Sequence, residues 1–190
     1  LKGANAPLDR GSKFVPDNDE LKTSSELCNL LSDRKIGGYL QHETRSHIRS
    51  DLLRYLFCSV YAQRYSVSPK FSDWQGDLKQ LKPSHQNIHF EEKRLTSKSH
   101  IDRFKVQIWD KPSSTVVSHI SKDGHYFIHP DPLQCRSLTV REAARLQTFP
   151  DNYFFAGPRT EQYHQVGNAV PVILAKNIAR TCISFLNEVL

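Results

Sequence analysis

The stretch RSLTVREAARLQTFPD, residues 136–151, decides most of what the sequence predicts about the fold. Thr139 and Glu142 have the spacing of a capping box, in which the threonine side chain caps a helix and the glutamate reaches back to the threonine amide. We therefore expect a helix from Thr139 through Gln147. It should end before Phe149-Pro150, because the residue before a proline avoids helical geometry.

A second helix is predicted at the C-terminal end of the chain. Asn168 is a favourable N-cap, and Pro171 is tolerated in a first helical turn. The free amides and the positive dipole end of such a start attract anionic groups, so the turn Gly167-Asn168 is a candidate ligand contact. Asn168 also fits the simpler role of a cap alone. The helix should bury one long stripe formed by Val170, Leu174, Ile178, Cys182 and Phe185.

The N-terminal part of the chain is harder to assign. Residues 1–40 are rich in Gly, Pro, Asp, Asn and Ser and predict an irregular lead-in, with a short helix around residues 25–31. Residues 44–65 follow a helical pattern, and Arg45 and Arg49 lie on its polar face. These arginines fit a solvated face, which is the simpler interpretation, or phosphate contacts. The buried stripe of this helix should consist of Ile48, Leu52, Leu56 and Val60.

Three strands are expected within residues 101–130. Residues 104–109 alternate apolar and polar side chains, and residues 114–120 and 125–129 have strand composition. The turn Lys122-Asp123-Gly124 between the last two contains the Asp-Gly pair of a β-hairpin.

Composition restricts the class of protein. Hydrophobic residues make up 38% and charged residues 24% of the 190, as in soluble globular proteins. No apolar run approaches the roughly 18 residues of a membrane span, and no secretion leader is recognisable, so we expect a cytoplasmic protein without a membrane partner. The net charge of +6 mildly favours a polyanionic partner. The four cysteines form no CxxC pair, and His125, His129 and Cys135 lack zinc spacing, so no disulfide framework or metal site is expected.

Two stretches resemble motifs of a known family. Residues 136–151 and the sequence QVGNAVP at 165–171 resemble the ninth and tenth motifs of the cytosine-5 DNA methyltransferases, in the family's order and spacing. The resemblance implies an α/β fold in two parts. Residues 1–135 would form a mixed α+β target-recognition region, and residues 136–190 would supply the C-terminal helices of a doubly wound methyltransferase fold that uses S-adenosylmethionine.

The resemblance also implies roles for individual residues. It places S-adenosylmethionine beside the turn of the tenth motif, which makes Asn168, Ala169 and Val170 the candidate cofactor contacts. The candidates for DNA contact come from the residues themselves: Lys122 and His125 belong to a polar turn just before the ninth motif, and Arg45 and Arg49 belong to the polar helix face. The ninth motif is scaffolding in the family, with arginines expected to be buried against acidic partners, and its structural residues here are Arg136, Thr139, Arg141, Glu142 and Arg145.

The family's catalytic motifs do not occur in this sequence. Members attack a flipped cytosine with the cysteine of a Pro-Cys-Gln loop, and use a Glu-Asn-Val glutamate and a Phe-x-Gly-x-Gly cofactor loop. No cysteine here follows a proline, residues 187–189 read Asn-Glu-Val, and Gly37-Gly38 lies in no strand-loop-helix context. Cys135 beside Arg136 is expected to be a structural thiol. We assign no catalytic residue in this chain.

The resemblance therefore predicts a part of an enzyme. The parent would methylate C5 of cytosine in a specific duplex sequence, as a bacterial enzyme of a restriction-modification system, with double-stranded DNA and an N-terminal catalytic half as partners. A start at Leu1 and the lack of methionine indicate an excised fragment, which alone should be inactive. The alternatives are a non-catalytic subunit of a split methyltransferase and a stand-alone DNA-binding module. The closing motifs leave an RNA substrate open.

Overall fold

The computed structural model describes residues 11–16, 26–33, 35–81 and 104–189. The chain forms two compact units that alternate along the sequence. The first comprises Leu1–Glu43, Thr115–Lys122 and Thr139–Leu190, and the second comprises Thr44–Ser114 and Asp123–Leu138. These boundaries differ from the division at residues 135 and 136 that the resemblance implies, because the N-terminal strands group with the C-terminal helices. The functional division stays a prediction.

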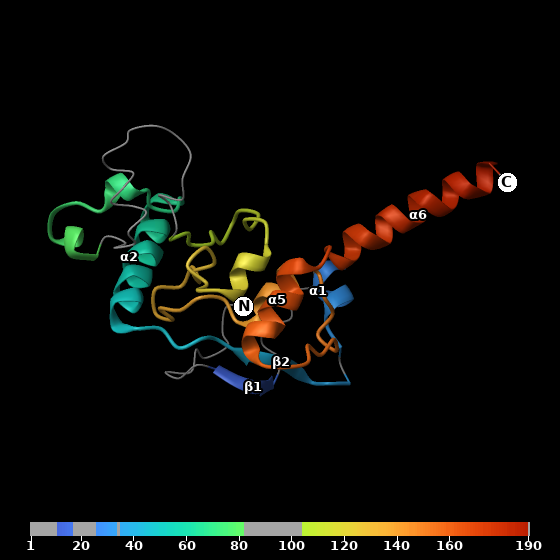
Figure 1. Cartoon of the computed structure of the whole chain (residues 1–190), viewed down its shortest axis with the longest axis horizontal. Coiled ribbons are helices and arrows are strands. Elements are labelled where there is room, and N and C mark those ends of the chain that lie inside the picture. Colours follow the sequence, from blue (N-terminus) through green and yellow to red (C-terminus); the bar gives the residue numbers. More distant parts are fainter. Residues whose placement is uncertain (1–10, 17–25, 34, 82–103, 190) are drawn as a thin grey trace. The chain divides into compact units, whose positions relative to one another are not determined.

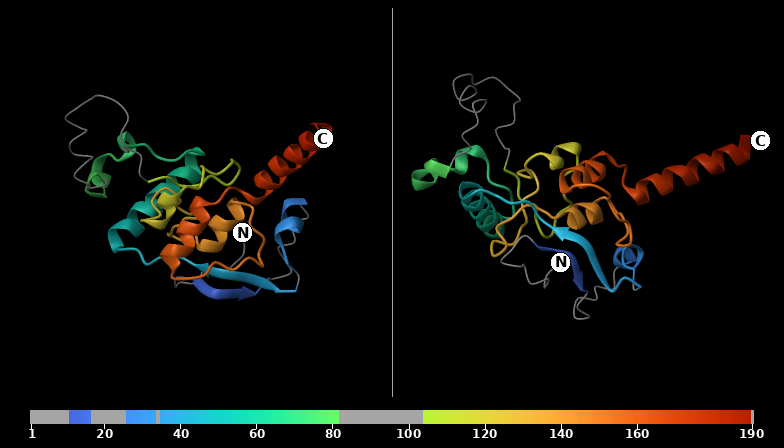
Figure 2. Two further views of the ribbon diagram at one scale, coloured as in Figure 1. Left: turned by 45° about the vertical axis from the view of Figure 1, so that its right-hand side comes forward. Right: turned by 60° about the horizontal axis from the view of Figure 1, so that its bottom comes forward.

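The first unit combines a small sheet with several helices. The sheet has two antiparallel strands, β1 and β2, which lie side by side (Figure 2). In their register Phe14 lies opposite Leu40. The short helix expected around residues 25–31 is confirmed, whereas the irregular lead-in expected for residues 1–40 contains β1 and the start of β2. The elements are β1 (Gly11–Pro16), α1 (Glu26–Leu31), β2 (Gly38–Glu43), the 3-10 helix η4 (Ser118–Ser121), α4 (Val140–Leu146), α5 (Arg159–Asn168) and α6 (Val172–Val189).

Helix α4 lies at the centre of this unit. Ala143 and Ala144 on α4 have no exposed surface, and the helix contacts both β2 and α5. Helix α5 buries Tyr163 and Val166, and it packs against η4. The small alanine side chains allow neighbouring elements to pack closely on α4. The helix of the stretch 136–151 therefore lies in the core of the unit.

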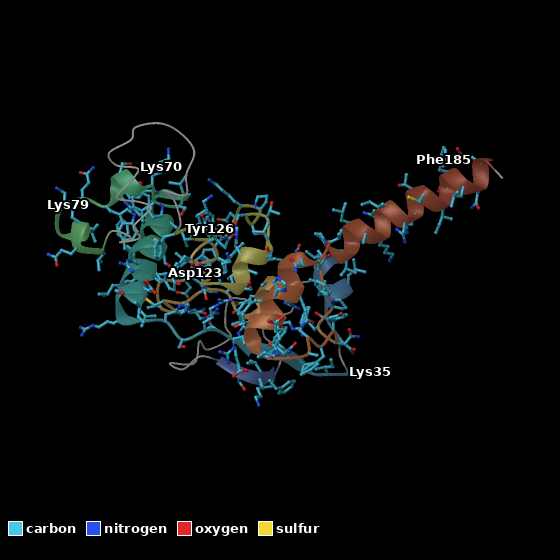
Figure 3. All side chains as sticks on the ribbon, in the orientation of Figure 1. Lys35, Lys70, Lys79, Asp123, Tyr126 and Phe185 are labelled. Carbon is cyan, nitrogen blue, oxygen red and sulfur yellow. The ribbon has the colours of Figure 1, made fainter. Side chains whose placement is uncertain are left out.

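The last predicted helix begins four residues later than expected, at Val172, and a separate helix, α5, precedes it (Figure 1). Asn168 ends α5 instead of beginning a helix, Ala169 is extended, and α6 starts at Val172. Pro171 marks the break because it cannot donate the amide hydrogen bond that a continuous helix needs. The expected buried stripe is also wrong: Phe185, labelled in Figure 3, is 63% exposed. The remaining stripe residues are exposed too, at Val170, Leu174, Ile178 and Cys182.

One segment passes a simple test for membrane spans. Within Arg159–Glu188, one window of 18 residues is apolar enough on average to cross a membrane, although Lys176 and Arg180 interrupt the apolar residues of this segment. The window is a weak indication, because the backbone leaves the helical conformation at Ala169 and core helices of soluble proteins pass the same test.

The second unit is built around helix α2 (Arg49–Tyr65) and contains the 3-10 helices η2 (Phe71–Asp73) and η3 (Gly76–Leu81). Its core joins α2 to residues from three later segments, and includes Tyr55, Cys58, Ala62, Trp74, Phe104, Val106 and Ile128. The predicted stripe of α2 faces solvent: Ile48 is 66% and Val60 is 49% exposed. Leu52 and Leu56 are 38% and 40% exposed. Residues four positions apart line two different faces of α2. The face with Tyr55 and Ser59 is the buried one, and its two hydroxyls form hydrogen bonds with other residues of the second unit.

The expected hairpin around Lys122-Asp123-Gly124 does not form. The turn is present, with Gly124 at φ 77°, but residues 114–120 form an irregular segment and η4. Ile128 pairs instead with Val106 in a parallel bridge and with Ser137 in an antiparallel bridge. Residues 104–109, which were expected to form a strand, make only the bridge between Val106 and Ile128. Phe104 and Val106 are buried, as the alternating pattern predicts.

Candidate functional site

The capping box predicted from the sequence is present at the start of α4. Thr139 Oγ1 accepts from the Glu142 amide at 3.1 Å, and Glu142 Oε2 accepts from the Thr139 amide at 2.7 Å. Thr139 Oγ1 also lies 3.1 Å from His42 Nδ1 on β2. The box therefore satisfies two amides of the helix start and ties α4 to the sheet.

Arg141 is a buried guanidinium that joins three segments of the first unit. Its side chain donates to the carbonyl oxygens of Leu40 at 2.9 Å, Pro150 at 3.0 Å and Tyr153 at 2.6 Å. Arg141 is 1% exposed, and this burial lowers the pKa of the guanidinium. We expected acidic partners for the arginines of this stretch, but Arg141 donates to backbone carbonyls. A guanidinium suits this position because its planar fork carries five donors.

The other two arginines also contact protein groups. Arg145 forms two parallel bonds with Asp151, at 2.9 Å and 2.8 Å, and its guanidinium lies 4.8 Å from the ring centre of Tyr39. This pair matches the expectation of an acidic partner. Arg136 donates to the carbonyl of Ser137 at 3.1 Å and to the side chain of Gln134. These contacts hold residues 136–151 in one conformation.

The candidate cofactor turn lies between α5 and α6 and comprises Asn168, Ala169 and Val170. Because Asn168 ends α5, it lies at the negative end of that helix dipole, and the argument from a helix start is wrong. The side-chain nitrogen Nδ2 of Asn168 lies 3.2 Å from His164 Nε2. Asn168 is exposed and Val170 is 57% exposed, so the turn presents a carboxamide and an apolar side chain at its surface.

The first amides of α6 already have partners. The Val172 amide donates to the Gln147 backbone carbonyl at 3.1 Å, and the Ile173 amide donates to Thr148 Oγ1 at 3.0 Å. Both acceptors lie in the two residues that directly follow α4. A ligand at this turn would therefore meet side chains and the remaining backbone groups instead of these two amides.

The candidates for DNA contact differ in exposure. Arg49, in the first turn of α2, and Lys122, after η4, are exposed, whereas Arg45 is half-buried. His125 is 7% exposed: its Nδ1 lies 2.8 Å from the Tyr55 hydroxyl, and its ring stacks on Phe104 with 4.4 Å between centroids. His125 is thus an interior residue of the second unit, and its assignment to a DNA contact was wrong in this geometry.

Comparison with known proteins identifies the family. The model of the C-5 cytosine-specific DNA methylases matches residues 18–184. The chain belongs to this family. A type II methyltransferase of Bacillus paralicheniformis is 66% identical over 90 residues, which cover 47% of this chain and 20% of the relative. A type II methyltransferase of Thalassovita gelatinovora is 44% identical over 87 residues, or 46% of this chain and 20% of the relative.

The similarity extends beyond bacteria. A DNA (cytosine-5)-methyltransferase of Arabidopsis thaliana is 48% identical over 68 residues, covering 36% of this chain and 8% of the plant protein. The chain thus spans about a fifth of the length of the two bacterial relatives.

Two of the cysteines of this DNA methylase chain, Cys58 and Cys135, are not activated. Burial, and then Asp131, raise the pKa of Cys135, whose thiol donates to the Pro132 carbonyl at 3.0 Å. Burial raises the pKa of Cys58 to about 12. A nucleophilic thiol needs the opposite shift. The described residues contain no group of three or more His, Cys, Asp or Glu side chains that could hold a metal ion.

Gln147 is the residue that the sequence reasoning missed. It follows α4, is 5% exposed, and donates from Nε2 to the carbonyls of Val166 and Ala169, both at 3.1 Å. Nothing in the local sequence predicts these partners, because they lie in another helix and in the turn that follows it. The one sequence feature that could have indicated a buried role is that Gln147, a polar residue, continues the apolar face of α4.

Proposed function

We propose that this chain is the C-terminal part of a DNA (cytosine-5-)-methyltransferase, which transfers a methyl group from S-adenosylmethionine to C5 of cytosine in a specific duplex sequence. The family match over residues 18–184 carries this proposal. The bacterial relatives are type II methyltransferases, which supports an enzyme of the restriction-modification type, acting in the cytoplasm.

The two parts of the chain would have different tasks. Residues 136–190 would return to the catalytic domain and complete a doubly wound fold, and residues 1–135 would contain the target-recognition region. The hydrogen bonds of Thr139, Arg141 and Arg145 support a scaffolding role for the ninth motif, since each joins segments within the first unit. The exposed apolar side chains of α6 support its packing on a further part of the fold.

The turn between α5 and α6 would hold the cofactor. Asn168 offers a carboxamide that can accept or donate a hydrogen bond, and Val170 offers exposed apolar surface. Both side chains fit a ligand that carries polar groups next to an apolar ring and chain. S-adenosylmethionine would supply the methyl group, and the residues of this chain would bind and orient it.

Catalysis would depend on residues that do not belong to this 190-residue chain. The catalytic cysteine motif does not occur among them, and Cys58 and Cys135 have raised pKa values. Duplex DNA would be contacted by exposed cations, for which Arg49 and Lys122 are the candidates and Arg45 a half-buried one. The chain alone would then be inactive.

A reconstitution experiment tests this assignment. The chain alone, the chain with the coding sequence that precedes it, and the chain mixed with that preceding part as a separate protein are incubated with duplex DNA and tritiated S-adenosylmethionine. We expect transfer to DNA by the second protein and none by the first. Transfer by the mixture as well would favour a split enzyme. Transfer by the chain alone would contradict the proposal, and so would transfer to RNA but not to DNA.

A further inference from the structure

The turn between α5 and α6 is held by one buried side chain, Gln147. Its carboxamide nitrogen lies within hydrogen-bond distance of three backbone carbonyls, those of Val116 at 3.4 Å, Val166 at 3.1 Å and Ala169 at 3.1 Å. Two of these carbonyls belong to the last turn of α5 and to the cofactor turn itself. An NH₂ group has two protons, so the three contacts share them, and the group is fully engaged.

The backbone around Gln147 adds a second connection. Its own carbonyl accepts from the Val172 amide, and the next residue, Thr148, accepts from the Ile173 amide through Oγ1 at 3.0 Å. Thr148 has φ 58°, a left-handed conformation that is uncommon for a β-branched residue. The strained backbone therefore directs two consecutive acceptors at the start of α6.

The other side of the turn is fixed by a close approach of two backbones. A Cβ on Gly167 would lie 2.6 Å from the Val117 carbonyl oxygen and 2.8 Å from the Ser118 amide nitrogen. Only glycine allows this approach. The turn is thus held between the end of α4 and the segment that leads into η4, and small changes at either side would displace it.

We propose that Gln147 is a positioning residue for the cofactor turn. Its buried carboxamide sets the place of Asn168, Ala169 and Val170 by holding the carbonyls of Val166 and Ala169, on the two sides of Asn168. The inference rests on the proposed function, in which this turn binds S-adenosylmethionine. Its specific content is that affinity for the cofactor depends on a buried carboxamide of the ninth motif.

The test uses the enzyme with its preceding coding sequence and the variant Gln147→Met, which has similar length but no donor. The matched control is Gln162→Met, because Gln162 makes one exposed bond, to Gly157, at 2.8 Å. Calorimetry measures binding of S-adenosylmethionine, and gel shift measures binding of duplex DNA. Leaving buried carbonyls without donors should weaken cofactor binding roughly tenfold or more. DNA affinity and the control should change less than about twofold, within the range of neutral surface substitutions.

Two further readouts separate positioning from general structure. The KM for the cofactor should rise while kcat at saturation stays near that of the original enzyme, and the amides of Ala169 and Val172 should exchange faster with solvent. Thr148→Val, which keeps the branched shape and removes only the acceptor of the Ile173 amide, should weaken cofactor binding in the same direction. If Gln147→Met does not fold, Gln147→Asn, which keeps the carboxamide on a shorter side chain, takes its place in the same assays.

The outcomes are distinct from those for the proposed function. If the original enzyme binds no S-adenosylmethionine, the proposed function fails. If it binds the cofactor and both variants bind equally well, Gln147 has no positioning role. Equal losses of cofactor and DNA affinity in both variants would also overturn the inference, because a general structural defect lowers both.

Discussion

Replacing Arg141 with methionine removes the donor that joins β2 to the segment after α4. The three carbonyl oxygens that it serves, on Leu40, Pro150 and Tyr153, lie 2.6 to 3.0 Å from its nitrogens. A hydrogen bond from a charged donor contributes about 1.5 kcal/mol at the lower end of its range, so the three together contribute at least about 4.5 kcal/mol. Relief of the buried charge offsets part of this. We expect Arg141→Met to lower the free energy of unfolding by about 3 to 5 kcal/mol.

Urea unfolding of the whole chain, followed by circular dichroism, measures this loss. Arg180→Met is the matched control, because Arg180 is exposed on α6 and should change stability by less than about 0.5 kcal/mol. Thermal unfolding should show a midpoint lower by roughly 6 to 20 °C for Arg141→Met. A loss below about 1 kcal/mol would refute the reasoning, since it would mean that the carbonyls find other donors or water at no cost.

Three further predictions address the cap, the DNA contact and the thiols. Thr139→Ala should destabilise the chain by about 1 kcal/mol in the same unfolding assay, and no loss would contradict the capping box. Arg49→Gln in the intact enzyme should weaken duplex binding on every sequence and reduce the salt slope by about one ion, whereas an unchanged slope would remove Arg49 from the interface. At pH 8, a maleimide should label exposed Cys182 quickly and Cys58 only after unfolding, because the pKa of Cys58 near 12 leaves a neutral thiol until the pH rises past that value. Rapid labelling of Cys58 in the folded chain would show that its burial is wrong.

Local signals predicted the start of α4 correctly. The capping box depends on Thr139 and Glu142 alone, so its geometry follows from residues three positions apart. The helix break at Ala169 did not follow from local signals, because an asparagine before a proline fits the start of one helix as well as the end of another. Here the Val172 and Ile173 amides find acceptors in the two residues directly after α4, which no local rule includes.

Burial was the least predictable property. On α2, the apolar spacing selected Leu52 and Leu56, but the helix buries Tyr55 and Ser59, whose hydroxyls reach His125 and the carbonyl of His129. Hydrophobic spacing predicts that a helix forms, but it does not predict which face of the helix packs against the rest of the protein. The same holds for the candidate site, since the sequence could name the turn at Asn168 but not the side chain that holds it.

The chemical identity of the product tests the central claim most directly. Duplex DNA is incubated with S-adenosylmethionine and the chain joined to its preceding coding sequence, then digested to nucleosides and analysed by mass spectrometry, with bisulfite sequencing to locate the modified base. We expect 5-methylcytosine within one short recognition sequence, and none when the 190-residue chain is used alone. Methylation of adenine or of the cytosine amino group, or 5-methylcytosine made by the chain alone, would contradict the account.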